Sequence, residues 1–296
     1  MRTEKNILIA FILNLAFSVF EFVGGILTGS VAIISDAVHD IGDAASIGIA
    51  YIFERKSKKS PDEAFTYGYA RYSAVGGLIT TIILLVGSVA VIVNAISRLL
   101  SPADINYNGM IIFAIVGVCV NALATFFTHK GESVNQKAVN LHMLEDLLGW
   151  IVVLVGAVVM RFTHLTLLDP IMSICIAVFI IVSAAKTFKE IIDIFLEKAP
   201  DGINVAEVKE HLGEIDGVID IHHIHLWSMD GHNCYATMHV VVDGEHTEIK
   251  EKIREELGHH GIAHITLELE SANEICHQKN CAVEFNASHA GHHHHH

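Results

Sequence analysis

Two pairs of residues with metal-binding side chains occur at the same spacing in otherwise apolar stretches. The first pair is His39 and Asp43, and the second is His142 and Asp146. On a helix, residues four positions apart lie on the same face, so each pair would present an imidazole and a carboxylate in one direction. Two such helices would supply two nitrogen and two oxygen ligands, a tetrahedral set that suits a borderline divalent cation such as zinc.

The same residues could instead serve only packing or hydrogen bonding inside a helix bundle. Ionisable side chains are costly within apolar segments and typically mark ion paths or cavities there, so the repeated pair favours metal binding. Asp36 falls near the face of His39 and is expected to orient a ligand or to line the entry. Glu145 lies next to Asp146, and the spacing leaves its role open.

The stretches that carry these pairs are long enough to cross a membrane. Of the 296 residues 52% are hydrophobic, and the mean hydropathy of +0.46 is too high for an ordinary soluble enzyme. A membrane-spanning helix needs about 20 apolar residues. Six stretches of this kind occur: Ile7–Thr28, Val31–Phe53, Ser73–Ser97, Met110–Thr128, Leu141–Met160 and Pro170–Phe195. We therefore predict an all-α, six-helix transmembrane domain over residues 1–199, surrounded by lipid bilayer, with Cys119 and Cys175 in its core.

Positive charge is distributed unevenly between the two sides of these predicted spans. One side has only Arg98 and Arg161 near its loops. The other side, which holds both ends of the chain, carries Arg2, Lys5, Arg55, Lys56, Lys58, Lys59, Arg71, Lys130, Lys137, Lys186, Lys189 and Lys198. Because lysine and arginine are enriched in cytoplasmic loops, both termini are predicted to be cytoplasmic, in a bacterial-type inner or cell membrane.

A small soluble domain is predicted after Pro200, where the composition changes. Segments with helical or strand periodicity follow in the order Val205–Leu212, Val218–Trp227, Cys234–Val242, Thr247–Leu257 and Ala263–Leu269. This α-β-β-α-β order is typical of a small α+β, ferredoxin-like domain of split βαβ type, here over residues 200–285. Most of the net charge of −14 falls in this part, which argues against a nucleic-acid partner. Residues 286–296 form a tail whose closing histidine run is typical of a purification tag.

The soluble part is rich in histidine and carries two cysteines near its end. Most of its histidines are better explained as solvated surface residues than as metal ligands. Cys276 and Cys281, with His277 alongside, indicate a soft-metal site, although zinc knuckles usually have tighter cysteine spacing.

These residues together resemble those of the cation diffusion facilitators, in particular their zinc-transporting branch. Besides the two His-x-x-x-Asp pairs, the likeness includes Asn14, Phe17 and Glu21 in the first span, Tyr67–Arg71, Asp169-Pro170 and His222–Trp227. The resemblance implies a homodimeric zinc/proton antiporter that exports zinc by alternating access and is not an enzyme. Zinc would be both the substrate and a regulatory ligand, and H⁺ would be the counter-substrate.

The resemblance also implies which residues bind the metal. The transport site would consist of His39, Asp43, His142 and Asp146. Cytoplasmic sites that sense zinc and stabilise the dimer would use His222, His239, His264 and Glu270, with Cys276 and Cys281 contributing.

Two other functions compete with zinc transport as interpretations of the sequence. An intramembrane metalloprotease, which would act on a protein substrate, needs a motif such as His-Glu-x-x-His, and the sequence has none. A membrane-anchored metal sensor would explain the histidine-rich soluble part alone. A sensor has no reason to place paired ligands in mid-bilayer, so the sequence favours a transporter.

Overall fold

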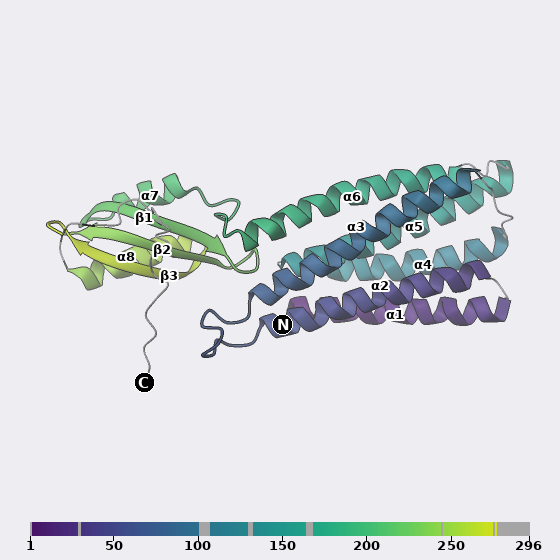
Figure 1. Cartoon of the computed structure of the whole chain (residues 1–296), viewed down its shortest axis with the longest axis horizontal. Coiled ribbons are helices and arrows are strands. Elements are labelled where there is room, and N and C mark those ends of the chain that lie inside the picture. The colour runs from purple at the N-terminus through teal and green to yellow at the C-terminus, as the bar shows by residue number, and fades with distance from the viewer. Residues whose placement is uncertain are drawn as a thin grey trace, which may run out of the picture. The chain divides into compact units, whose positions relative to one another are not determined.

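The chain folds into two compact units. The computed structural model describes residues 2–28, 31–100, 107–129, 133–163, 168–243, 245–274 and 276. The first unit comprises Met1–Leu196 with Met229–His232, and the second comprises Glu197–Ser228 with Asn233–His296. The first is helical and the second combines helices with a sheet, so each is described by itself (Figure 1).

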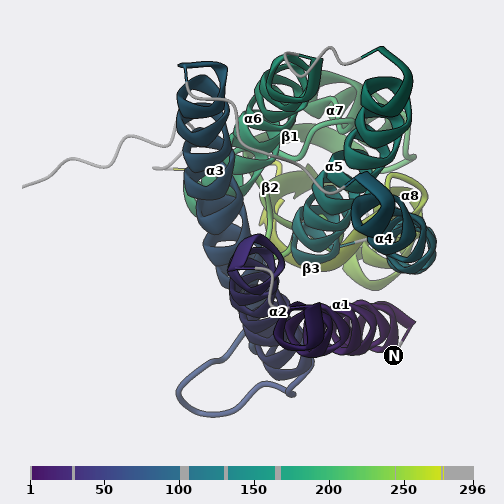
Figure 2. The ribbon, with the colours of Figure 1, turned by 90° about the vertical axis from the view of Figure 1, so that its right-hand side faces the viewer.

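Long helices make up the first unit, and each of the six apolar stretches lies within one of them (Figure 2). They are α1 (Arg2–Thr28), α2 (Val31–Ser57), α3 (Arg71–Leu100), α4 (Tyr107–Thr128), α5 (Val134–Thr163) and α6 (Leu168–Phe195). Within the described residues, four segments are long and apolar enough to cross a membrane: Thr3–Gly24, Arg71–Ser97, Ile111–Thr128 and Val134–Gly156. Helix α2 is less apolar because it contains Asp36, Asp40 and Asp43.

Close packing joins these helices. Helix α1 packs against α2 and α4, α3 packs against α2, α5 and α6, and α5 also packs against α4 and α6. Gly117 on α4 lies directly against the Trp150 ring of α5, where a Cβ atom would overlap the indole. The Trp150 ring in turn meets Phe17 of α1 edge-on, with ring centroids 5.2 Å apart. The missing side chain of Gly117 therefore lets three helices share one aromatic contact.

The first unit has apolar side chains outside and polar side chains inside. Large exposed residues on its helices include Val86, Val93, Ile112, Phe126 and Phe162. The buried polar residues include Asn14, Ser18, Glu21, Asp43, Ser46, Thr80, Thr81, Ser88, Asn121 and His142. This distribution suits a helix bundle in lipid whose interior holds the functional groups.

The two cysteines of the first unit lie outside the predicted core. Cys119 and Cys175 are both exposed. The prediction that they are core residues was wrong, because in a membrane protein an apolar position can face lipid as readily as the interior.

The second unit contains the predicted α-β-β-α-β order. Its elements are α7 (Val205–Gly213), β1 (Val218–Ser228), β2 (Cys234–Val242), α8 (His246–His259) and β3 (Ile262–Ser271). Strand β1 pairs antiparallel with β2, and β2 pairs parallel with β3. In a split βαβ unit another strand would lie between the two parallel strands. Among the described residues β2 and β3 are direct neighbours, so the unit is an unsplit βαβ.

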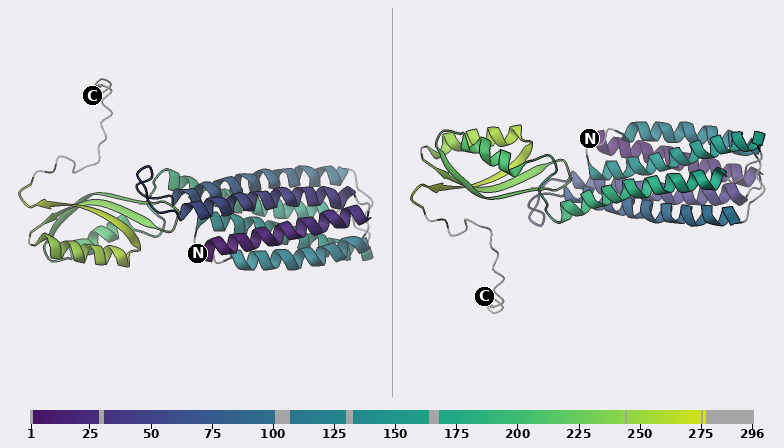
Figure 3. Two further views of the ribbon diagram at one scale, coloured as in Figure 1. Left: turned by 90° about the horizontal axis from the view of Figure 1, so that it is seen from below. Right: turned by 90° about the horizontal axis from the view of Figure 1, so that it is seen from above.

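Both helices of the second unit cover the same face of its sheet (Figure 3). Along β2 every second residue is buried, from Cys234 through Met238 to Val242. These side chains pack against Val208 and Leu212 of α7 and against α8. Because neighbouring residues in a strand point to opposite faces, Tyr235, Thr237 and His239 lie on the face without helices. The sheet therefore has an apolar face under the helices and an open face that carries histidines.

Candidate metal centres

The first candidate centre lies between α2 and α5 in the first unit. Asp43 of α2 and His142 and Asp146 of α5 bring one ligand atom each within 4.8 Å of one another. His142 Nε2 lies 3.6 Å from Asp43 Oδ1, and the side chains of both residues are buried. His39 precedes Asp43 by one turn on α2, and its side chain falls outside the described part of the chain. The structure thus gathers an imidazole and two carboxylates from the two His-x-x-x-Asp pairs.

Two side chains donate hydrogen bonds to carboxylates at and beside this centre. The Asn14 amide of α1 donates a hydrogen bond to Asp146 Oδ2 at 3.3 Å. Ser88 of α3 donates to Glu145 Oε1 at 2.8 Å. Glu145 therefore points to α3. The sequence spacing had left the role of this carboxylate open, and the structure shows that it accepts a hydrogen bond from Ser88.

A buried carboxylate joins α2 to α3 and α5 near one end of the bundle. Glu54 Oε2 accepts hydrogen bonds from Ser73 Oγ at 2.8 Å, from Ser133 Oγ at 3.2 Å and from Asn135 Nδ2 at 3.3 Å. Asn135 also donates to the Ala50 carbonyl at 2.8 Å. Glu54 lies near the end of α2, and Ser133 and Asn135 lie at the start of α5. Because Glu54 and its donors are buried, these hydrogen bonds hold the two helix ends together.

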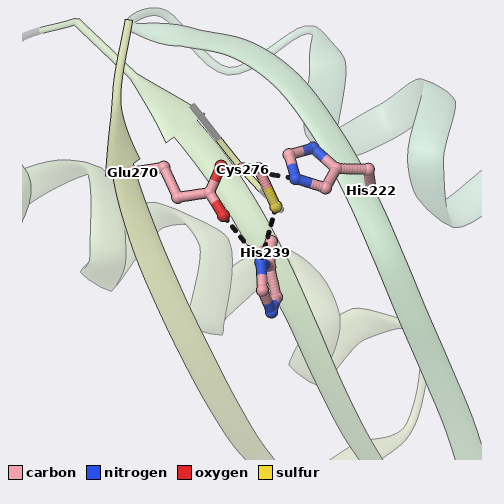
Figure 4. Close-up of side chains that lie close together, drawn as sticks. All are labelled: His222, His239, Glu270 and Cys276. Carbon is pink, nitrogen blue, oxygen red and sulfur yellow. Dashed lines mark hydrogen bonds and ion pairs between the residues drawn. The ribbon is translucent and has the colours of Figure 1, made fainter. Parts of the chain in front are cut away.

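The second candidate centre lies on the open face of the sheet in the second unit. Figure 4 shows His222 of β1, His239 of β2, Glu270 of β3 and Cys276 converging from three strands and the segment that follows them. His239 Nδ1 lies 2.6 Å from Glu270 Oε1 and 3.6 Å from Cys276 Sγ. His222 Nε2 lies 3.3 Å from the other oxygen of Glu270.

Glu270 is prepared to act as an anionic ligand in this centre. Burial alone would raise the pKa of its carboxyl group. Hydrogen bonds from Cys276 and His239, together with the charges of the two histidines, outweigh burial and hold the pKa of Glu270 below its usual value. Two imidazoles, a carboxylate and a thiol are together a donor set that suits zinc.

Family comparisons assign the two parts of the chain to a known protein class. Residues 7–196 match the cation efflux transmembrane domain, and residues 200–272 match the cytoplasmic domain of cation efflux proteins. The chain belongs to the cation efflux family. The resemblance to the cation diffusion facilitators is thereby confirmed, and members of this family are transporters rather than enzymes.

Full-length relatives of this cation efflux protein are found in several bacteria. It is 34% identical to zinc transporter ZitB of Yersinia pestis over 99% of this chain and 95% of the relative. It is 31% identical to ZitB of Escherichia coli K12 over 98% and 94% of the two chains. It is 30% identical to a cadmium, cobalt and zinc/H⁺-K⁺ antiporter of Bacillus velezensis over 99% and 96%.

The remaining predicted ligands of the cation efflux protein lie elsewhere. His264 of β3 is paired with Tyr235, and their rings are 5.6 Å apart, so it is not part of the His239 cluster. Cys281 lies outside the described residues. Glu268, which the sequence reasoning did not single out, lies 3.1 Å from His239 Nε2. Its position two residues before Glu270, on the same strand face, is the signal that could have identified it.

Proposed function

We propose that this cation efflux protein exports zinc from the cytosol in exchange for protons, by alternating access to a site between α2 and α5. The observation that supports the proposal is the buried cluster of Asp43, His142 and Asp146 inside a helical unit with an apolar exterior. His39 is proposed as the fourth ligand, because it lies one turn before Asp43 on α2. The names of the relatives as zinc transporters and as a cadmium, cobalt and zinc antiporter agree with this substrate class.

The donor types and their separation suit zinc. With metal–ligand bonds of about 2.0–2.1 Å, the ligand atoms of a tetrahedral zinc site lie about 3.3–3.4 Å apart. The 3.6 Å between His142 Nε2 and Asp43 Oδ1 is close to this separation. Mixed nitrogen and oxygen donors favour zinc over manganese, whereas an all-oxygen site would favour manganese. We therefore expect His39→Asp to weaken discrimination against manganese.

Proton exchange follows from the charge of the site. Two carboxylates close together in a low-dielectric interior carry a high electrostatic cost unless a cation neutralises them. Zinc removes that cost while it is bound, and protons can take its place after it leaves. Because metal ligands must be deprotonated to bind, the two occupants exclude each other. A site that opens alternately to the two sides of the membrane would then exchange zinc for protons.

Zinc flux into proteoliposomes tests this proposal. We expect Asp43→Asn and Asp146→Asn to abolish uptake, because each removes an anionic ligand. Glu190→Gln is the matched control, since Glu190 is an exposed carboxylate on α6 that pairs with Lys137 at 3.2 Å. Uptake that persists in both aspartate variants would refute the site assignment. Uptake that does not respond to an imposed pH gradient would refute antiport.

We further propose that the six helices all span a bacterial-type inner membrane with both termini in the cytoplasm. On this topology the second unit is a cytoplasmic α+β domain, in which zinc binding at His239 strengthens a homodimer. The match of residues 200–272 to the cytoplasmic domain of the family supports this. Light scattering of the full chain should show a dimer that zinc stabilises against dilution, and a monomer at all zinc concentrations would refute it. We expect no nucleic-acid partner and no protein substrate.

A further inference from the structure

A third group of metal-ligand side chains lies on the helix-covered side of the sheet in the second unit, opposite the His239 cluster. His211 belongs to the last turn of α7, while Glu256 and His260 lie one turn apart at the end of α8. His211 Nδ1 lies 2.9 Å from His260 Nε2. Glu256 Oε1 lies 3.4 Å from the His211 nitrogen and 3.5 Å from the His260 nitrogen. Three potential ligand atoms thus form a nearly equilateral triangle.

The size of this triangle matches one face of a zinc coordination tetrahedron. The ligand atoms of such a site lie about 3.3–3.4 Å apart, and the three observed separations are 2.9, 3.4 and 3.5 Å. Two imidazoles and a carboxylate are also the protein ligands of known zinc sites that keep one coordination position for water. We infer that His211, Glu256 and His260 bind a divalent cation of the zinc type. The inference does not depend on the transport proposal.

The fold holds the three side chains in place through the backbone. Glu256 and His260 are four residues apart, and the backbone N–H of His260 bonds to the Glu256 carbonyl at the end of α8. The adjacent faces of α7 and α8 are fixed by a shared apolar core that includes Leu212 and Leu257. A bound ion would therefore join α7 to α8 without requiring the helices to move.

The site is also accessible to an ion and has a candidate fourth ligand. The His211 side chain is 41% exposed and that of Glu256 is 31% exposed, so a cation can reach the triangle from solvent. His259 Nδ1 lies 3.7 Å from the second oxygen of Glu256. The fourth position is thus available either to water or to the exposed imidazole of His259.

A hydrogen-bonded cluster without metal is the alternative explanation. In that case one imidazole donates to the other, and Glu256 pairs with whichever ring is protonated. Such a cluster needs a specific tautomer on each ring and leaves its longer contacts, 3.4 and 3.5 Å, weak as hydrogen bonds. A cation accepts a lone pair from all three atoms at once, which is why the geometry favours metal binding.

Cobalt binding to the full chain in detergent separates the two explanations. All versions should carry serine in place of His292–His296, because that histidine run would itself bind metal. We expect Glu256→Gln and His211→Gln each to bind about one Co²⁺ per chain fewer than the parent. Glu255→Gln is the matched control, because Glu255 is the neighbouring, exposed carboxylate on α8 and should bind as many ions as the parent.

The absorption spectrum assigns any lost ion to its site. The His239 cluster contains the Cys276 thiol and should show a sulfur-to-cobalt charge-transfer band, whereas the His211 site contains no sulfur. The Glu256→Gln variant should therefore lose the part of the visible cobalt absorption that belongs to the His211 site and keep the charge-transfer band. Unchanged binding in Glu256→Gln with parental helix content by circular dichroism would overturn the inference. An equal loss in Glu255→Gln would overturn it as well, and Glu256→Gln decides the matter if His211→Gln does not fold.

Discussion

Asn14 is expected to set the affinity of the membrane site although it is not a proposed ligand. Its amide donates a hydrogen bond to Asp146 Oδ2, and its side chain is almost fully buried. Partners of this kind orient the ligand, and their loss typically weakens metal binding 10–100-fold, or about 1.4–2.7 kcal/mol. The bond is 3.3 Å long, slightly beyond the usual range for N–H···O bonds. We therefore expect the low end, a loss of about tenfold in Asn14→Leu.

The measurement is the initial rate of zinc uptake into proteoliposomes at a series of zinc concentrations. Asn14→Leu should raise the KM for zinc about tenfold and change the maximal rate much less, since all proposed ligands remain. Leucine has the same branching and as many side-chain heavy atoms as asparagine. It also leaves Ser18 Oγ its 2.9 Å bond to the Asn14 carbonyl, so this buried hydroxyl keeps a partner.

Ser18→Ala provides the matched control for Asn14→Leu. Ser18 Oγ contacts Asn14 Oδ1 at 3.3 Å, and its removal leaves the bond from Asn14 to Asp146 intact. The KM of this variant should stay near the parental value. If Asn14→Leu is folded and its KM lies within about threefold of the parent, the bond to Asp146 does not tune the site and the reasoning fails.

Three further outcomes follow from contacts in the two units. Glu54→Ala should lower the free energy of unfolding by about 3–5 kcal/mol, read as a lower Tm in detergent, because it leaves Ser73 and its neighbours without their buried acceptor. Gly117→Ala should cost about 1–3 kcal/mol in the same assay, because the new methyl group overlaps Trp150. His239→Gln should abolish the sulfur-to-cobalt band, and in the parent that band should fade as the pH is lowered, because protons compete with the metal for its ligands.

The elements of the second unit were predicted closely from the sequence. Strand β2 has the predicted bounds, Cys234–Val242, because its buried residues alternate without interruption. The predicted helices were one or two residues short at their ends, where capping rather than periodicity sets the boundary. Periodicity therefore sufficed for locating elements, since each of them has one clearly apolar face.

The choice of metal-binding histidines in β1 could not be made from strand alternation, although the family resemblance named His222. Strict alternation puts His222 and His225 on opposite faces of a strand. The structure pairs them with His239 and Thr237, which lie on the same face of β2. The irregularity between them is a bulge at His223, which has a φ of 52° that residues other than glycine rarely adopt. A single extra residue thus places His222 and His225 opposite residues of the same face of β2, which strict alternation does not predict.

The membrane unit posed a different difficulty, because apolar sequence does not distinguish lipid from protein interior. Cys119 and Cys175 illustrate this, since both were assigned to the core and both are exposed. Polar residues carry the missing information. Asn14 and Ser88 are buried and contact carboxylates beside the proposed site, and a rule that polar residues of a span face inward would have found both.

Helices α2 and α5 are joined at two levels, which bears on how the membrane site could change its access. At one level Asp43 faces His142, and at the other Glu54 accepts hydrogen bonds from Ser133 and Asn135. Eleven residues of α2 separate the two levels, a rise of about 16 Å. In the proposed exchange, gain and loss of a dication change the charge only at the first level, whereas the hydrogen bonds of Glu54 do not involve the metal. Movement between α2 and α5 during the proposed transport should therefore be largest at the metal site and smallest at Glu54. Glu54→Ala would then disturb the contact between α2 and α5 as well as the stability of the fold.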